Sequence, residues 1–471
     1  MHAGRVIKTV IKQILDVKKF GIVDMSSKEQ IFEALNRSSF TRQHFYFYVT
    51  IAACHFFDGF DVHVIGYVLP GIIREFKLTG GQAGVMGSAA LAGMLLGGVI
   101  VGTVADIIGR KKALIFAVAA FGLTSLAAGF ASSFSALVVI RFIQGFGLGA
   151  EVPLVFTYLS EFLPARHRGM LTATIVAFWQ GASFVAGGLA IYVIPAYTWR
   201  GMFIFAAVPV VLLLIPVLRI PESIRFLLLR GRLSEAETIA RRFSDIDPTS
   251  ISVSAVEHVE QRASLKDLMS AGYLRTTAGI WIMQFCNGAK DVSLAVWLPT
   301  IFVNMGFSLV KSFAFTATVA AAGALGNVVA GSCLDRIGRR PTLITAYFTS
   351  ALLMLAWGSA SSEMALIMLG CLTVFFAGSL GGPSYTYASE VYPTRFRATG
   401  TGWAAACQRA GGIAAPTLLG IVLASSHSSF VFFAAISAMM FVGGMTMLFL
   451  GYETKGRSLE QIQSQLSARR I

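Results

Sequence analysis

Apolar runs of about twenty residues recur along the chain and are separated by short polar segments. Each run is long enough to cross roughly 30 Å of hydrocarbon as an α-helix. The period-two alternation that is typical of membrane β-barrels does not occur in the sequence. The pattern therefore predicts an all-α polytopic membrane protein with twelve spans, near residues 45–70, 84–105, 113–131, 135–160, 171–194, 200–219, 273–303, 313–334, 342–360, 363–389, 399–424 and 429–450.

The polar segments divide the chain into five parts. A tail over 1–44 precedes a six-helix half over 45–219, and a linker over 220–272 leads to a second half over 273–450. The tail over 451–471 ends the sequence. The linker contains a helical stretch, residues 234–242. The first tail has apolar residues at helical spacing, which fits a membrane-surface segment, but a true start at Met25 is equally open.

Lysine and arginine are unevenly distributed among the polar segments. If both termini and the linker face the cytoplasm, 31 of the 38 basic residues lie inside and four lie outside. This follows the positive-inside rule and predicts cytoplasmic termini. It also explains the net charge of +14 without nucleic acid. Only 13% of residues are charged, about half the fraction of soluble proteins, and the absence of large outside loops suits a bacterial inner membrane.

Several motifs recur at one offset of 229 residues. Asp106-Ile-Ile-Gly-Arg-Lys-Lys112 returns as Asp335-Arg-Ile-Gly-Arg-Arg-Pro341, and Ser160-Glu-Phe-Leu-Pro-Ala-Arg-His-Arg168 returns as Ser389-Glu-Val-Tyr-Pro-Thr-Arg-Phe-Arg397. A single register predicts two six-helix halves repeated in parallel, an arrangement that rocking transporters use around a central site. The same offset aligns the first and seventh spans at Asp58-Gly-Phe-Asp61 and Asn287-Gly-Ala-Lys290.

Over about residues 45–462, these motifs resemble the major facilitator superfamily. Asp58-Gly-Phe-Asp61 and Arg409-Ala-Gly-Gly412 are similar to stretches of the aromatic-acid and nicotinate:proton symporters, a branch that also resembles the synaptic vesicle glycoprotein 2 group and is related to sugar porters. The resemblance implies proton-coupled symport of a small organic anion, an aromatic or heteroaromatic carboxylate, by alternating access. It implies a monomer in the lipid bilayer, with no cofactor.

Ionisable groups inside spans are costly, so each is a candidate for function. Asp58 and Asp61 share one face of the first span. The resemblance to proton-coupled sugar porters implies that Asp61 pairs with Arg141 of the fourth span. A carboxylate gains a proton more readily when such a partner leaves. We therefore predict proton coupling at Asp61, gated by Arg141, with Asp58 as a second candidate; a static ion pair between the two spans is the alternative.

Arg409 is the second candidate cation, in the eleventh span. Its partner under the repeat is Gln180, and both spans line the central cavity in the family's fold. A guanidinium group there would bind a substrate carboxylate through two hydrogen bonds. The alternative is an internal ion pair with Asp291 or Glu151.

Lys290 aligns with Asp61 under the repeat. It either binds the anion or bridges the halves by pairing with Asp58 or Asp61, and the sequence does not separate these interpretations. Sugar porters carry Asn where Lys290 stands, which argues against a sugar. Further candidate substrate contacts are aromatic or amide side chains: Trp179, Gln180, Asn287, Gln408 and Tyr385.

The repeated loops carry a second set of charges, which the resemblance assigns to a cytoplasmic gate that controls turnover. These residues are Asp106, Arg110, Glu161, Asp335, Arg339 and Glu390. Rival functions are a sugar or polyol symporter, a drug or metabolite exporter, and a transporter-like receptor. We find no nucleophile–base pair that would indicate an enzyme, and the five cysteines show no metal-ligand spacing.

Overall fold

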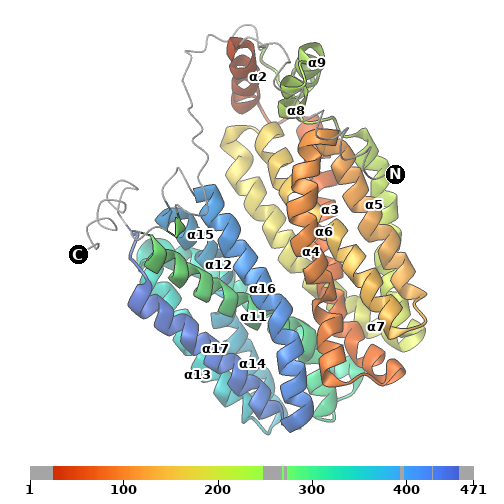
Figure 1. Ribbon diagram of the computed structural model, residues 1–471, viewed down its shortest axis with the longest axis vertical. Helices are drawn as coiled ribbons and strands as arrows, with labels where there is room; N and C mark the ends of the chain where they lie inside the picture. Colours follow the sequence, from red (N-terminus) through yellow and green to blue (C-terminus); the bar gives the residue numbers. More distant parts are fainter. Residues whose placement is uncertain (1–24, 248–267, 270–272, 393–396, 427, 456–471) are drawn as a thin grey trace.

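The computed structural model describes residues 25–247, 268–269, 273–392, 397–426 and 428–455, and helices account for most of them (Figure 1). Two helix bundles lie side by side. The first contains α3 (Arg42–Phe76), α4 (Gly80–Ile108), α5 (Arg110–Gly129), α6 (Phe134–Phe162) and α7 (Ala165–Arg219). The second contains α11 (Leu274–Asn304), α12 (Leu309–Arg336), α13 (Arg339–Gly358), α14 (Glu363–Gly378), α15 (Gly381–Val391), α16 (Arg397–Ser426) and α17 (Ser429–Leu450).

The prediction of twelve spans is confirmed, with two differences in how they are joined. In the described part of the chain, ten helices are long and apolar enough to cross a membrane. Helix α7 holds the fifth and sixth predicted spans, which meet at a kink where Thr198 has non-helical torsion angles (φ 59°, ψ −175°). Helix α11, which contains Lys290 and Asp291, corresponds to the seventh predicted span and completes the set of twelve. The tenth predicted span is broken into α14 and α15 at Ser379 and Leu380.

Three short helices lie at one end of the first bundle (Figure 1). They are α2 (Met25–Arg37), α8 (Ile224–Leu229) and α9 (Leu233–Phe243), and we call their end the linker end. Helix α9 confirms the helical stretch predicted in the linker. The opposite end, where α4 begins and α16 ends, is called the far end. The apolar positions predicted to line a surface helix before Met25 lie outside the described residues.

The two halves contact each other mainly toward the far end. Gly80 and Gly420 approach so closely that a Cβ atom on either would collide with the other's carbonyl oxygen. Ser88 Oγ and Thr417 Oγ1, on α4 and α16, lie 3.3 Å apart. The two helices then diverge toward the linker end (Figure 1). This arrangement leaves Trp403, near the linker end of α16, 42% exposed.

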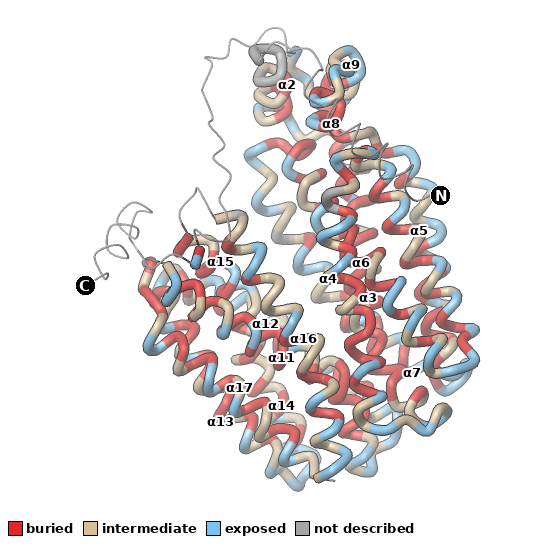
Figure 2. The backbone as a smooth tube through the Cα atoms, viewed as in Figure 1, coloured by how far each residue is buried: buried red, intermediate tan, exposed pale blue. Residues whose placement is uncertain are grey.

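Burial distinguishes the central helices from the peripheral ones (Figure 2). In its most apolar stretch, α3 has 61% of its residues buried, against 31% for α4. Large apolar side chains on the outer surface are exposed; Val328 and Leu352, for example, are 72% and 70% exposed. Such a surface is unfavourable in water but favourable in lipid. Helix α3, which carries Asp58 and Asp61, is thus among the well-buried helices.

Candidate functional site

Asp61 and Arg141 form a buried ion pair in the centre of the first half. Arg141 Nη1 donates to Asp61 Oδ2 at 2.9 Å, and the two residues are 2% and 1% exposed. Gln144 Nε2 donates to Asp61 Oδ1 at 2.7 Å, and Ser125 Oγ donates to the same oxygen at 3.4 Å. Arg141 also lies over the ring of Phe203. These hydrogen bonds favour the ionised form of the carboxylate and join α3, α5 and α6.

Asp58 belongs to a different cluster from Asp61. One turn before Asp61 on α3, its Oδ2 lies 3.7 Å from His55 Nδ1. The same His55 nitrogen lies 3.2 Å from Glu151 Oε2 on α6. Asp58 and Asp61 therefore share a helical face but lie beside different residues of α6. Asp61 pairs with Arg141, whereas Asp58 lies near Glu151, which is further along α6.

Arg409 lies at the contact between the halves and is only partly buried. Its Nη1 lies 3.5 Å from where a Cβ on Gly98 of α4 would be. It interacts electrostatically with Asp58 of the first half and Tyr385 of the second. Among the described residues, Arg409 forms no ion pair, so neither of the predicted internal partners, Asp291 and Glu151, is bound to it. A guanidinium group without a carboxylate partner in this position can accept an anionic ligand.

Lys290 pairs within its own half. Its Nζ lies 2.7 Å from Asp291 and donates to the carbonyl oxygen of Ala377 at 2.8 Å. The bridge to Asp58 or Asp61, one of the two interpretations that the sequence left open, is not formed in this structure. A buried ammonium group needs the nearest available oxygens, and α11 and the end of α14 provide them. Lys290 is 1% exposed, whereas the side chain of Asp291 is 47% exposed.

The other candidate substrate contacts divide into open and buried groups. Trp179 packs against Gly59 and lies 5.0 Å, centroid to centroid, from the ring of His63. Tyr385 donates a hydrogen bond to Gln408, and the tyrosine is 38% exposed. Gln180 is partly buried. Asn287 is fully buried, and neither its Oδ1 nor its Nδ2 has a partner among the described residues.

Comparison with known proteins places this geometry in a family. Residues 47–466 match the family described as "Sugar (and other) transporter". The chain belongs to this transporter family. It is 30% identical to the niacin transporter NiaP of Acinetobacter baylyi, over 86% of this chain and 93% of that one. It is 30% identical to a gallate transporter of Pseudomonas putida (84% and 89% covered) and 29% identical to the 4-hydroxybenzoate transporter PcaK of Acinetobacter baylyi (80% and 84% covered).

Solved structures agree on the fold. The inward open xylose transporter XylE from E. coli superposes with a TM-score of 0.73 at 20% identity, covering 89% of this chain and 99% of that one. A D-xylose–proton symporter gives a TM-score of 0.71 at 19% identity, with 88% and 99% covered. The major facilitator resemblance is confirmed, and the protein is a membrane transporter and not an enzyme.

In this transporter the predicted gate charges form one network in each half. Arg110 pairs with Glu161, and Ser223 Oγ accepts from Arg110 at 3.0 Å and donates to Glu161 at 2.6 Å. Asp106 lies 3.8 Å from Arg110 and has a largely exposed side chain. In the second half, Arg339 Nη2 lies 2.8 Å from Glu390. Asp335 lies on α12, but its side chain is outside the described set.

Two further carboxylates belong to these networks, and the sequence analysis gave them no role. Glu222 Oε1 accepts from the backbone N–H of Lys111, and Glu453 accepts from the backbone N–H groups of Arg339 and Arg340. Each carboxylate lies at a helix N-terminus, where backbone donors favour an anion. The available signal in the sequence was that each carboxylate lies in a polar segment next to the spans, Glu222 in the linker and Glu453 in the C-terminal tail.

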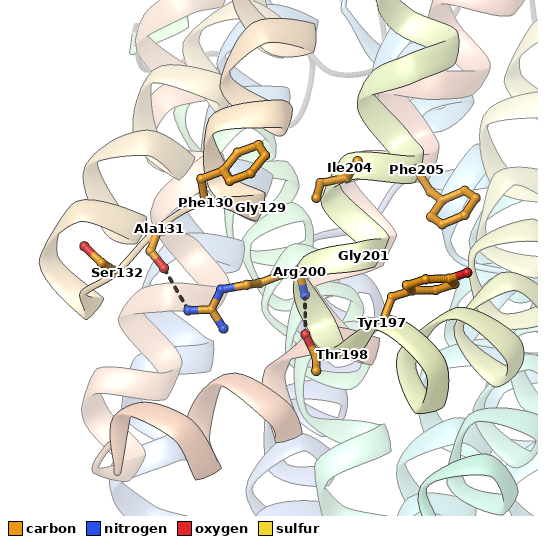
Figure 3. Close-up of a pocket in the computed structure, with 10 residues that line it drawn as sticks. All are labelled: Gly129, Phe130, Ala131, Ser132, Tyr197, Thr198, Arg200, Gly201, Ile204 and Phe205. Carbon is orange, nitrogen blue, oxygen red and sulfur yellow. Dashed lines mark hydrogen bonds between the residues drawn. The ribbon is translucent and has the colours of Figure 1, made fainter.

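A pocket of about 650 Å³ opens at the far end, within the first half (Figure 3). It lies between the end of α5 and the kink of α7. Arg200 donates from Nη2 to the carbonyl oxygen of Ala131 at 3.0 Å, and its Nη1 pairs with Glu75 at 2.6 Å. None of its lining residues is a predicted substrate contact, so this pocket is separate from the candidate site between the halves.

Proposed function

We propose that this protein is a proton-coupled symporter of a small aromatic or heteroaromatic carboxylate. The observation that carries the proposal is Arg409, a cation without an ion pair among the described residues, at the contact between two halves. Relatives named for niacin, gallate and 4-hydroxybenzoate support an aromatic acid as the ligand. The linker end faces the cytoplasm of a bacterial cell, because the basic residues concentrate there.

Arg409 anchors the substrate carboxylate in this proposal. A charge-assisted, two-pronged hydrogen bond would fix both the position and the orientation of the acid group. Trp179 and Tyr385 contact the ring, and Gln180, Gln408 and Asn287 supply hydrogen bonds. Lys290 acts indirectly, since its ammonium group is already bound by Asp291 and Ala377.

Asp61 carries the coupled proton, and Arg141 gates it. When the carboxylate takes a proton it loses its Coulomb attraction to Arg141, while Gln144 and Ser125 still hold hydrogen bonds to it. Protonation therefore weakens the electrostatic tie between α3 and α6, and these helices can then shift within the first half as the protein changes state. The networks around Arg110 and Arg339 control the change of state at the linker end, through Asp106, Glu161, Asp335 and Glu390.

The test is uptake into proteoliposomes under an imposed pH gradient. Labelled nicotinate, 4-hydroxybenzoate, gallate and xylose are supplied separately, with and without a protonophore. We expect protonophore-sensitive accumulation of at least one carboxylate and none of xylose. Accumulation of xylose alone would replace the proposal with a sugar symporter, and carboxylate uptake that ignores the pH gradient would remove proton coupling.

A further inference from the structure

A second cluster of ionisable side chains lies beside the Asp61–Arg141 pair. The ligand atoms of His55, Asp58 and Glu151 lie within 4.8 Å of one another, and all three residues are buried. We call these three residues the triad. Helices α3 and α6 run in opposite directions, so the triad lies nearer the linker end than Asp61 and Arg141 do. It is separate from the ion pair.

The triad lacks the donors that two ionised carboxylates require. Neither oxygen of Asp58 has a hydrogen-bond partner among the described residues, and Glu151 Oε1 has none either. Both residues are 0% exposed. His55 can supply only one positive charge, so one carboxylate would remain uncompensated in a medium of low polarity. Like charges at this distance favour protonation of one carboxylate.

The charges around the triad come from both halves. Asp61 lies one turn beyond Asp58 on α3. Arg409 of α16 approaches α6 near Glu151, because a Cβ on Gly98 would lie 3.5 Å from Arg409 Nη1 and 3.2 Å from the carbonyl oxygen of Gly149. Since Arg409 makes no ion pair among the described residues, its positive charge favours the ionised triad. A ligand carboxylate on Arg409 would cancel that charge and leave the triad with an excess of negative charge.

Resting on the proposed function, we propose that the triad is a second proton-binding site that fills when a substrate carboxylate binds Arg409. The proton adds from water to a carboxylate oxygen of Asp58 or Glu151. It returns to water at the linker end after the substrate leaves and Arg409 again faces the triad. By reciprocity, a protonated triad raises the affinity of Arg409 for the substrate by the same factor.

Two proton sites change the energetics of transport. Each coupled proton multiplies the maximal accumulation by about ten for every unit of pH gradient. Wild-type protein, with both Asp61 and the triad, should therefore accumulate the substrate about 100-fold for each unit of pH gradient at zero membrane potential. A variant without a functional triad should accumulate the substrate only about 10-fold for each unit of pH gradient. Cotransport of a monoanion with two protons also moves one net positive charge, which a voltage measurement detects.

The experiment measures proton uptake when the transported carboxylate binds. The full chain in detergent is titrated with that carboxylate in buffers of different ionisation enthalpy, and calorimetry gives the number of protons taken up. We expect Glu151→Gln to lower this number and to reduce accumulation in proteoliposomes about tenfold per pH unit. Asp58→Asn is the second variant, in case the first does not fold. Glu363→Gln, which changes an exposed pair with Lys311, is the matched control.

The outcomes separate this inference from the proposed function. Carboxylate transport with the same proton number in wild type and in both triad variants would overturn the role of the triad alone. Wild-type transport that requires Na⁺ or a divalent cation would also overturn it, in favour of a cation site. Failure of the wild type to transport any carboxylate would overturn the proposed function itself, and the triad's role with it.

Discussion

At position 61 the first half buries a carboxylate against Arg141, whereas the matching position of the second half, 290, buries an ammonium group against Asp291. At a second aligned pair of positions, the first half has the neutral Gln180 and the second half has the cation Arg409. At the linker end the halves stay alike: Gly109 and Gly338 both have positive φ, and a Cβ on either would collide with a carboxylate. The repeated loops keep one structure, and the central helices have diverged in charge.

Under the proposed function, this difference gives the two halves different tasks. The first half holds carboxylates that can change charge, namely Asp61 and the triad. The second half holds cations, of which Lys290 is neutralised in place and Arg409 has no ion pair among the described residues. Because a proton and an anion require opposite charges, a transporter of both gains from two halves that are structurally similar and electrostatically opposite.

The largest expected effect comes from Asp61→Asn, which removes the ionisable group of the first half. Accumulation should fall by about 100-fold under a gradient of two pH units, because one driving proton is lost. Exchange of labelled for unlabelled substrate should continue. Stability should also fall by about 3–5 kcal/mol, since Arg141 is left buried without its partner. Accumulation at the wild-type level would remove Asp61 from coupling.

Arg409→Ala tests the second half against its repeat partner. We expect the apparent affinity for the carboxylate to fall roughly 10- to 100-fold, from the loss of about 1.5–3 kcal/mol of charged hydrogen bonding. Gln180→Ala should cost about tenfold or less, because an amide makes weaker hydrogen bonds. Both are measured by competition binding in detergent. Equal effects at the two positions would contradict the assignment of the anchor to one half.

Lys290→Met should destabilise the protein more than it affects substrate affinity. Removing one partner leaves Asp291 without its cation, although partial exposure of Asp291 lets water or a counter-ion limit the cost to about 1–3 kcal/mol. Adding Asp291→Asn should recover part of this loss, which thermal unfolding measures. If the single variant loses affinity at unchanged stability, Lys290 binds the substrate directly.

Glu222→Gln and Glu453→Gln test the likeness of the two linker-end loops. Each change weakens a charged cap at a helix N-terminus, and each should cost about 0.5–2 kcal/mol. Unfolding of the purified chain measures this cost, and initial uptake rates report the effect on turnover. A loss confined to one half would show that the two loops are not equivalent.

The smallest effect concerns the contact between Ser39, just after α2, and Asp245 of the linker. Hydrogen bonds from the Ser39 hydroxyl and backbone N–H hold the pKa of Asp245 below its usual value. A depressed pKa means that this contact is fully present above the usual carboxyl pKa and is lost as the pH falls through the lowered value. Hydrogen exchange of α2 should rise at acid pH in the wild type. Ser39→Ala should reduce this pH dependence.

The sequence alone determined the spans, the repeat and one site partner. Apolar runs of sufficient length predict helices because the bilayer leaves backbone groups no other partner. The offset of 229 residues predicted two matched halves, and the family resemblance supplied Arg141 as the partner of Asp61. The bounds of the predicted spans follow the observed helices closely, except at Thr198, where the helix continues through a kink, and at Ser379, where it breaks.

The tertiary structure decided which side chains meet. Asp58 and Asp61 share a helical face, yet one lies beside His55 and Glu151 and the other beside Arg141. Lys290 pairs with its neighbour Asp291 and not across the halves. Hydropathy indicates only whether a helix is apolar enough to lie in lipid, and helical spacing indicates only which residues share a face of that helix. The rotation and level at which α3 packs against α6 choose the partners, and those depend on side-chain packing across the whole bundle.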